Sequence, residues 1–208
     1  QVLKNLGLGA GYVIAAPAVF NILQSCKSDP KSDWQPVFMN ASNGYALTQV
    51  LDVILPKTDT PGASELNIAQ FIDSYMDEVA GDKQREEFKA GANAFALSFK
   101  ENFDKELEDG EAKDFEKAVA KYLGADEETR NAYLKRISET QDPEAPEADF
   151  DAHAGSYAYL NAVRDLGIWA WKNSEAVGEN VLWYDPIPGA YLGCISTEEA
   201  GGGKTMSL

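Results

Sequence analysis

Histidine and cysteine are scarce in this sequence, which holds one histidine and two cysteines among 208 residues. A zinc site normally takes three or four ligands, some at short spacing, and the sequence contains neither a CxxC nor an HExxH pattern. His153 has no nearby cysteine or serine elbow to serve, so we interpret it as a capping or surface residue. No pair of carboxylates stands isolated among apolar residues as a general acid and base would. We therefore expect no catalytic residue, no cofactor-binding residue and no metal ligand in this chain.

Basic residues are also few. Lysine and arginine number 18 against 34 aspartates and glutamates, which gives a net charge of -16 and a pI near 4.4. Phosphate backbones repel such a polyanion, so the composition argues against nucleic-acid binding. The same charge argues against docking onto anionic lipid by electrostatics alone.

One long uncharged run, residues 6–23, stands near the N-terminus. It is short and rich in glycine and proline for a membrane span, but it fits the apolar core of an export signal. Leu23-Gln24-Ser25-Cys26 resembles a bacterial lipobox, which predicts lipidation of Cys26, and residues 1–4 resemble the part of a twin-arginine signal that follows the arginines. We expect a bacterial protein of the periplasm or cell envelope, exported by the twin-arginine route and associated with the membrane through this segment.

The length favours one domain with appended segments. Residues 27–44 are polar and punctuated by prolines, as in a tether, and residues after Ser196 are acidic and glycine-rich, as in a disordered end. We therefore divide the chain into an export segment (1–26), a tether (27–44), a helical domain (45–196) and a flexible tail (197–208).

Within that domain, apolar residues recur at helical spacing in one stretch after another. The pattern predicts an all-α fold, a compact multi-helix domain. The stretches run from Leu47 to Ile54, Ile68 to Val79, Phe88 to Leu107, Phe115 to Leu123, Tyr133 to Ile137 and Tyr157 to Trp171.

The first of these helices meets a hard stop at Pro56, which lacks the N–H that a continuing helix needs. Residues 57–63, Lys-Thr-Asp-Thr-Pro-Gly-Ala, follow it and are rich in groups that bond to their own backbone, so they predict a rigid turn. The turn is interpreted either as a structural corner or as the signature of a family.

A second unusual stretch, Trp183 to Cys194, combines prolines and glycines with large aromatic and aliphatic groups. The prolines and glycines disfavour regular secondary structure, and the large apolar side chains favour burial. We therefore expect this stretch to run in an extended course over a surface. Wraps of this kind favour contacts with another protein.

The LPxTDTPGA-like sequence from Leu55 to Ala63, Phe71-Ile72-Asp73 after it, and the PGxYxGC segment from Pro188 to Cys194 together resemble the gluconate 2-dehydrogenase subunit 3 family. The resemblance spans most of residues 46–194. Between the motifs, residues 101–149 offer little that is diagnostic.

This resemblance implies a helical, non-catalytic subunit that binds, stabilises and helps to export a large flavoprotein of the glucose-methanol-choline type. The large subunit would hold FAD and oxidise a sugar, glycoside or polyol, and a cytochrome c or a quinone would accept the electrons. The residues that we expect to dock this partner are Thr58, Asp59, Thr60, Pro61, Gly62, Trp183, Tyr184, Pro188, Gly189 and Tyr191.

If Cys26 carries lipid, Cys194 has no partner within the chain. An odd cysteine in an exported protein indicates an intersubunit disulfide or a buried thiol. Two alternatives to the subunit hypothesis remain: a stand-alone periplasmic lipoprotein that acts as a binding or scaffold module, and an enzyme that uses Asp59 and its neighbours as a polar site.

Overall fold

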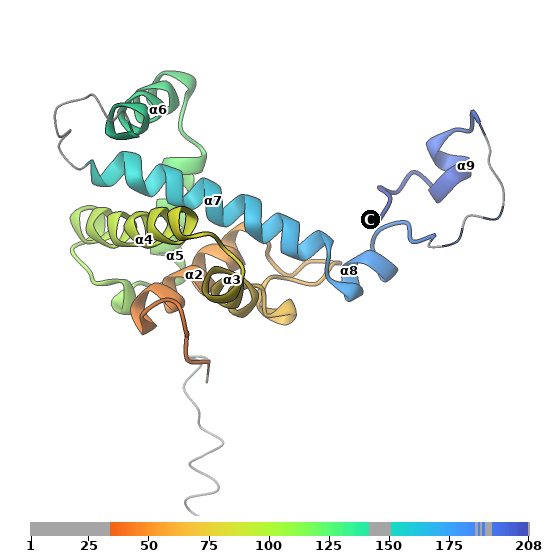
Figure 1. Cartoon of the computed structure of the whole chain (residues 1–208), viewed down its shortest axis with the longest axis horizontal. Coiled ribbons are helices and arrows are strands. Elements are labelled where there is room, and N and C mark those ends of the chain that lie inside the picture. The colour runs from red at the N-terminus through yellow and green to blue at the C-terminus, as the bar shows by residue number, and fades with distance from the viewer. Residues whose placement is uncertain (1–33, 142–150, 186, 188, 190–192, 208) are drawn as a thin grey trace, which may run out of the picture. The chain divides into compact units, whose positions relative to one another are not determined.

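The structure is a computed structural model that describes residues 34–141, 151–185, 187, 189 and 193–207. The unit described below begins at Gln35. In the part of the chain that the structure describes, every regular element is helical, so the all-α prediction is confirmed (Figure 1). The helices are α2 (Ala41–Ile54), α3 (Ile68–Glu78), α4 (Asp82–Phe103), α5 (Ala112–Leu123), α6 (Glu127–Gln141), α7 (Ala152–Lys172), α8 (Glu175–Asn180) and α9 (Thr197–Gly201), with 3₁₀ turns at Ser64–Leu66 and Leu107–Asp109.

Helix α7 is the element that the others contact, because α2, α3, α4, α5 and α6 all pack against it. Its closest neighbour is α4, which runs antiparallel to it (Figure 1). Small residues allow this approach: a Cβ added at Gly155 would lie 2.6 Å from the Cβ of Ala94, and one added at Gly91 would lie 2.9 Å from the Cβ of Tyr159. Such contacts leave no room for a side chain, so the two glycines set the spacing of the helix pair.

Three of the four phenylalanines of α4 lie in the core as their spacing predicts, and Phe103 at the end of the helix is half-buried. Phe88, Phe95 and Phe99 are buried, and Phe99 stacks on Phe115 of α5 with ring centroids 4.8 Å apart. The one polar pair deep in the α4–α7 contact joins the hydroxyls of Ser98 and Ser156 at 2.7 Å. Pairing satisfies both groups where water is excluded.

The segment predicted as a tether differs from the expectation at its C-terminal end. Helix α2 begins at Ala41, where the Asn40 side chain accepts a hydrogen bond from the Asn43 N–H at 2.8 Å. Asn40 is a favourable N-cap residue, and its hydrogen bond allows the helix to begin several residues before Leu47, where the apolar pattern begins.

Residues 37–39 are held by a buried carboxylate. The side chain of Asp73 in α3 has no exposed surface, and its two oxygens accept hydrogen bonds from the backbone N–H groups of Val37, Phe38 and Met39 at 2.7–3.3 Å. Phe38 is then buried against Phe88, 6.4 Å between centroids. These bonds therefore hold the backbone of residues 37–39 against the domain just before α2 begins.

A second carboxylate, that of Asp114 at the start of α5, accepts hydrogen bonds from Lys105 Nζ at 2.6 Å and from the Glu111 N–H at 3.1 Å. The Lys105 ammonium, more than any other group, holds the pKa of the Asp114 carboxyl below its usual value.

Replacing Asp114 with asparagine is expected to lower stability at neutral pH and to flatten the acid limb of the stability curve. Because the folded-state pKa lies below the unfolded-state value, the stabilisation is present above the unfolded pKa and is lost as the pH falls through the folded one. The free energy of unfolding, measured by urea titration between pH 7 and pH 3, should show the two proteins converging at the acid end. Curves that stay parallel would contradict this role.

Candidate partner-docking surface

The predicted turn is a compact corner built from its own backbone. The Ala63 N–H donates to the Leu55 carbonyl at 2.9 Å, and the Gly62 N–H donates to Glu65 Oε2 at 3.1 Å. A Cβ at Gly62 would lie 2.7 Å from the backbone nitrogen of Lys57. The chain approaches itself too closely there for any residue but glycine.

Helix α7 fixes this turn from the other side. The Trp171 Nε1–H donates to the Pro61 carbonyl at 2.8 Å, across 110 positions of sequence. At the end of the turn, the Asp52 carboxylate accepts from both the Ser64 N–H at 3.1 Å and the Ser64 hydroxyl at 2.7 Å. The turn is thus rigid relative to α2 and α7, as a recognition surface requires.

The five turn residues expected to dock a partner differ in exposure. Thr58 and Asp59 are exposed, Thr60 and Pro61 are half-buried, and Gly62 is buried. Asp59 forms no hydrogen bond or ion pair with any residue that the structure describes. A cavity of about 400 Å³ lies against the turn, lined by Lys57, Thr58, Asp59, Thr60, Pro61, Glu65 and Leu66.

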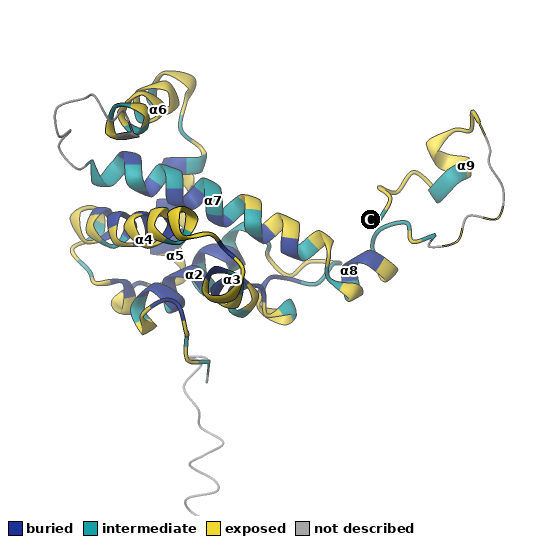
Figure 2. Ribbon diagram, in the orientation of Figure 1, coloured by how far each residue is buried: buried dark blue, intermediate teal, exposed yellow. Residues whose placement is uncertain are grey.

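Three aromatic rings from two helices meet at the surface. Phe71 and Tyr75 of α3 and Trp169 of α7, which we call the aromatic platform, have ring centroids 5.6–6.3 Å apart. Phe71 is 41% exposed and Trp169 48% exposed, and Ile168 next to them is 38% exposed. Figure 2 shows the exposed residues along this end of α7. Grouped aromatic side chains open to solvent are typical of protein-contact sites.

Sequence periodicity missed this platform because it placed Phe71 and Tyr75 on the same apolar stripe as Ile68 and Ile72. The buried face of α3 is instead rotated towards Ala69 and Asp73. A buried aspartate is the reason, since it must face the N–H groups of residues 37–39. The sequence did carry one signal of this: the apolar residues of α3 cover an arc of the helix that is too wide for a single buried face.

The C-terminal segment closes on itself. The Trp183 N–H donates to the Thr205 carbonyl at 2.9 Å, and the Trp183 carbonyl accepts from the Ser207 N–H at 2.7 Å. Gly201 packs against the Trp183 ring, where an added Cβ would lie 2.5 Å from Cδ2. Helix α9 therefore stands inside the stretch predicted as a flexible tail, and its flexibility stays a prediction.

The expected docking residues of this segment are placed only in part. Trp183 is half-buried, Tyr184 is 50% exposed and Gly189 is exposed. Pro188 and Tyr191 lie outside the described residues, as does Cys26 at the lipobox. Cys194 is an exposed free thiol. Among the described residues, no hydrogen bond joins this segment to the turn at residues 57–63.

Two further observations concern the described residues alone. They contain no group of three or more His, Cys, Asp or Glu side chains arranged to hold a metal ion. They also contain no helix long and apolar enough to cross a membrane.

Comparison with known proteins gives one match. The model of a family described as gluconate 2-dehydrogenase subunit 3 matches residues 41–189, a range that includes the turn and the aromatic platform. No curated protein and no solved structure matches the chain.

Proposed function

Because the chain belongs to the gluconate 2-dehydrogenase subunit 3 family, we propose that it is a non-catalytic small subunit that binds and stabilises a large FAD-dependent dehydrogenase. The match confirms the family resemblance drawn from the turn and C-terminal motifs. The large subunit would be of the glucose-methanol-choline type and would act on a sugar, glycoside or polyol, with a cytochrome c or quinone as electron acceptor. FAD would lie in that subunit, and this chain would hold no cofactor of its own.

The observation that best supports a docking role is the aromatic platform. Phe71 and Trp169 keep large apolar areas in solvent although the core beside them is well packed. Exposing such side chains to water is unfavourable, and covering them with a protein surface recovers that free energy. The turn at residues 57–63, which the Trp171 bond holds to α7, supports the same role because little order has to be gained there on binding.

Export belongs to the same proposal. The uncharged run at residues 6–23 and the lipobox-like sequence ending at Cys26 support a role in carrying the folded complex across the membrane and anchoring it in the cell envelope. A twin-arginine route accepts folded proteins, so one signal can serve two subunits that are already bound to each other.

Cys194 supports a covalent link between the subunits. Its thiol is exposed, and an exported complex meets an oxidising compartment where two thiols lose two electrons and two protons to the cell's disulfide-forming machinery. The complex should therefore migrate as one covalent pair on a non-reducing gel and separate when Cys194 is replaced by serine. Two separate bands for the wild-type complex would remove this part of the proposal.

The test of the function is an absorption spectrum of the complex captured through this chain from its native host. A flavin band that travels with a larger polypeptide, at a constant ratio through gel filtration, is the expected result. The band should be lost with a Trp169→Asp/Phe71→Asp double variant and retained with Leu97→Asp, since Leu97 is 55% exposed on α4 and lies outside the platform. A colourless monomer would overturn the subunit proposal in favour of a stand-alone lipoprotein.

A further inference from the structure

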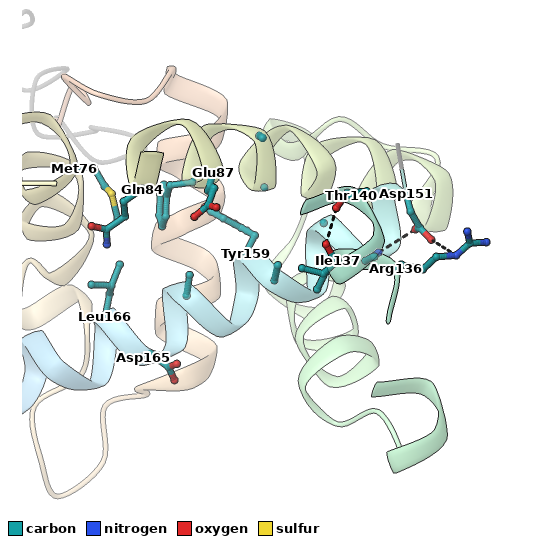
Figure 3. A pocket seen from close by; sticks show the side chains of 17 residues that line it. Met76, Gln84, Glu87, Arg136, Ile137, Thr140, Asp151, Tyr159, Asp165 and Leu166 are labelled. Atoms are coloured by element: carbon teal, nitrogen blue, oxygen red, sulfur yellow. Dashed lines mark hydrogen bonds and ion pairs between the residues drawn. The ribbon is translucent and has the colours of Figure 1, made fainter. Parts of the chain in front are cut away.

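An open groove of about 740 Å³ runs between α4 and α7, bordered at one end by α6 (Figure 3). We call it the α4–α7 groove. Figure 3 shows Met76, Gln84 and Glu87 at one end with Leu166, and Ile137 with Asp151 at the other. Most of the remaining lining is alanine, glycine and the Phe88 and Tyr159 rings.

The groove is long and narrow rather than compact. Its α7 wall extends from Asp151 to Leu166, and a rise of about 1.5 Å per residue makes this wall about 22 Å long. Residues line it at spacings of three and four, so one face of α7 is left open along four turns. A helix of about 14 residues matches this length, whereas a compact small molecule would fill only one end.

The depth of the groove favours a partner with large apolar side chains. Ala158 and Ala162 on α7 and Ala90 on α4 present only methyl groups, and Phe88 and Leu166 add larger apolar surfaces to the lining. Leucine or phenylalanine side chains of an added helix can fit between these walls, as ridges fit into grooves in other helix pairs.

The charged residues that line the groove indicate which sign of charge the partner should carry. The lining contains three carboxylates, those of Glu87, Asp151 and Asp165, and one guanidinium, that of Arg136. Arg136 already lies 3.8 Å from Asp151. Glu87 on α4 and Asp165 on α7 lie at the other end of the groove. Each pairs with an exposed cation on its own helix, and such surface ion pairs are weak, so both carboxylates remain available to a partner. The lining is therefore net negative, in a chain of net charge -16, and it complements basic side chains.

We propose that the α4–α7 groove docks an amphipathic helix of a partner protein, with an apolar face seated between α4 and α7 and lysine or arginine side chains beside it paired with Glu87 and Asp165. Anionic lipids and fatty acids are negatively charged like the groove lining and are therefore disfavoured. The groove shares no lining residue with the aromatic platform, although Leu166 lies one turn of α7 before Trp169. The site goes beyond the dehydrogenase-binding role proposed above and can be tested without the dehydrogenase.

The test is a fluorescence-anisotropy titration of the full chain with a labelled helical peptide of about 14 residues, built from leucine and lysine with the leucines on one face. The peptide should bind, and its counterpart with glutamate in place of lysine should not. Ala162→Trp, which fills the groove, and Glu87→Lys, which removes the net negative charge of its lining, should each weaken binding about tenfold or more. Circular dichroism and thermal unfolding verify the fold of each variant.

Matched controls separate the groove from the general acidity of the chain. Glu86 is an exposed neighbour of Glu87 outside the groove, so Glu86→Lys changes the net charge equally and should leave the affinity unchanged. Ala120→Trp adds the same ring to the exposed face of α5 and should also have no effect. Equal losses for Glu86→Lys and Glu87→Lys, or undiminished binding to Ala162→Trp, would overturn the proposal. Because no dehydrogenase enters this titration, such a failure would leave the proposed function standing.

Discussion

Replacing Asp73 with alanine is expected to lower the free energy of unfolding by about 3 kcal/mol, because hydrogen bonds to a buried charged acceptor are among the stronger ones and several are lost together. The Asp73 oxygens accept the N–H groups of residues 37–39. Without the Asp73 carboxylate, the backbone of Phe38 and Met39 loses these hydrogen bonds, and the burial of their apolar side chains is weakened as well. Urea denaturation followed by circular dichroism measures this change.

Asp77, four positions further along α3, provides the matched control. It is exposed and pairs with Arg85 at 3.7 Å, a surface ion pair worth less than about 1 kcal/mol. Asp77→Ala should therefore be nearly silent. Asp73→Asn should fall between the two, since an amide keeps one acceptor oxygen and turns an NH₂ group towards a backbone N–H. An Asp73→Ala protein as stable as Asp77→Ala would show that the carboxylate does not hold the 37–39 segment.

Replacing Trp169 with alanine is expected to weaken binding of the large dehydrogenase subunit by about 30-fold or more, the effect of about 2 kcal/mol that is typical of an interface hot spot. Trp169 touches both Phe71 and Tyr75 and is 48% exposed, so its removal takes the centre out of the aromatic platform. Isothermal titration calorimetry of the two purified subunits measures the affinity.

Leu97→Ala is the comparison for this experiment. Leu97 is a large apolar residue of similar exposure on α4, away from α3 and the end of α7. Its removal should leave the affinity within about twofold, as expected for contacts outside a hot spot. If Trp169→Ala binds as tightly as Leu97→Ala, the dehydrogenase uses another face of this chain, and the family assignment is unaffected.

The sequence by itself determined where the six longer helices lie, together with the family, but not the short helices α8 and α9. These features depend on local chemistry. Helical spacing of apolar residues predicts where helices form, and Pro56 ends α2 because it lacks an N–H. The residues after Pro56 predict a turn, but the close approach that requires glycine at residue 62 is seen only in the structure. The motifs around the turn and after Trp183 were enough to indicate the family that the comparison then matched.

Only the tertiary structure decided which faces of those helices are buried and which remain open. Asp73 looks like any surface aspartate until residues 37–39 bring their N–H groups to it, and that contact turns Phe71 outwards. The bond from Trp171 to the turn spans 110 positions, and the α4–α7 groove exists because two antiparallel helices meet at glycines and alanines. Such features depend on contacts between residues that are distant in the sequence. The spacing of side chains along one helix gives the width of its apolar face but does not say which neighbour covers that face.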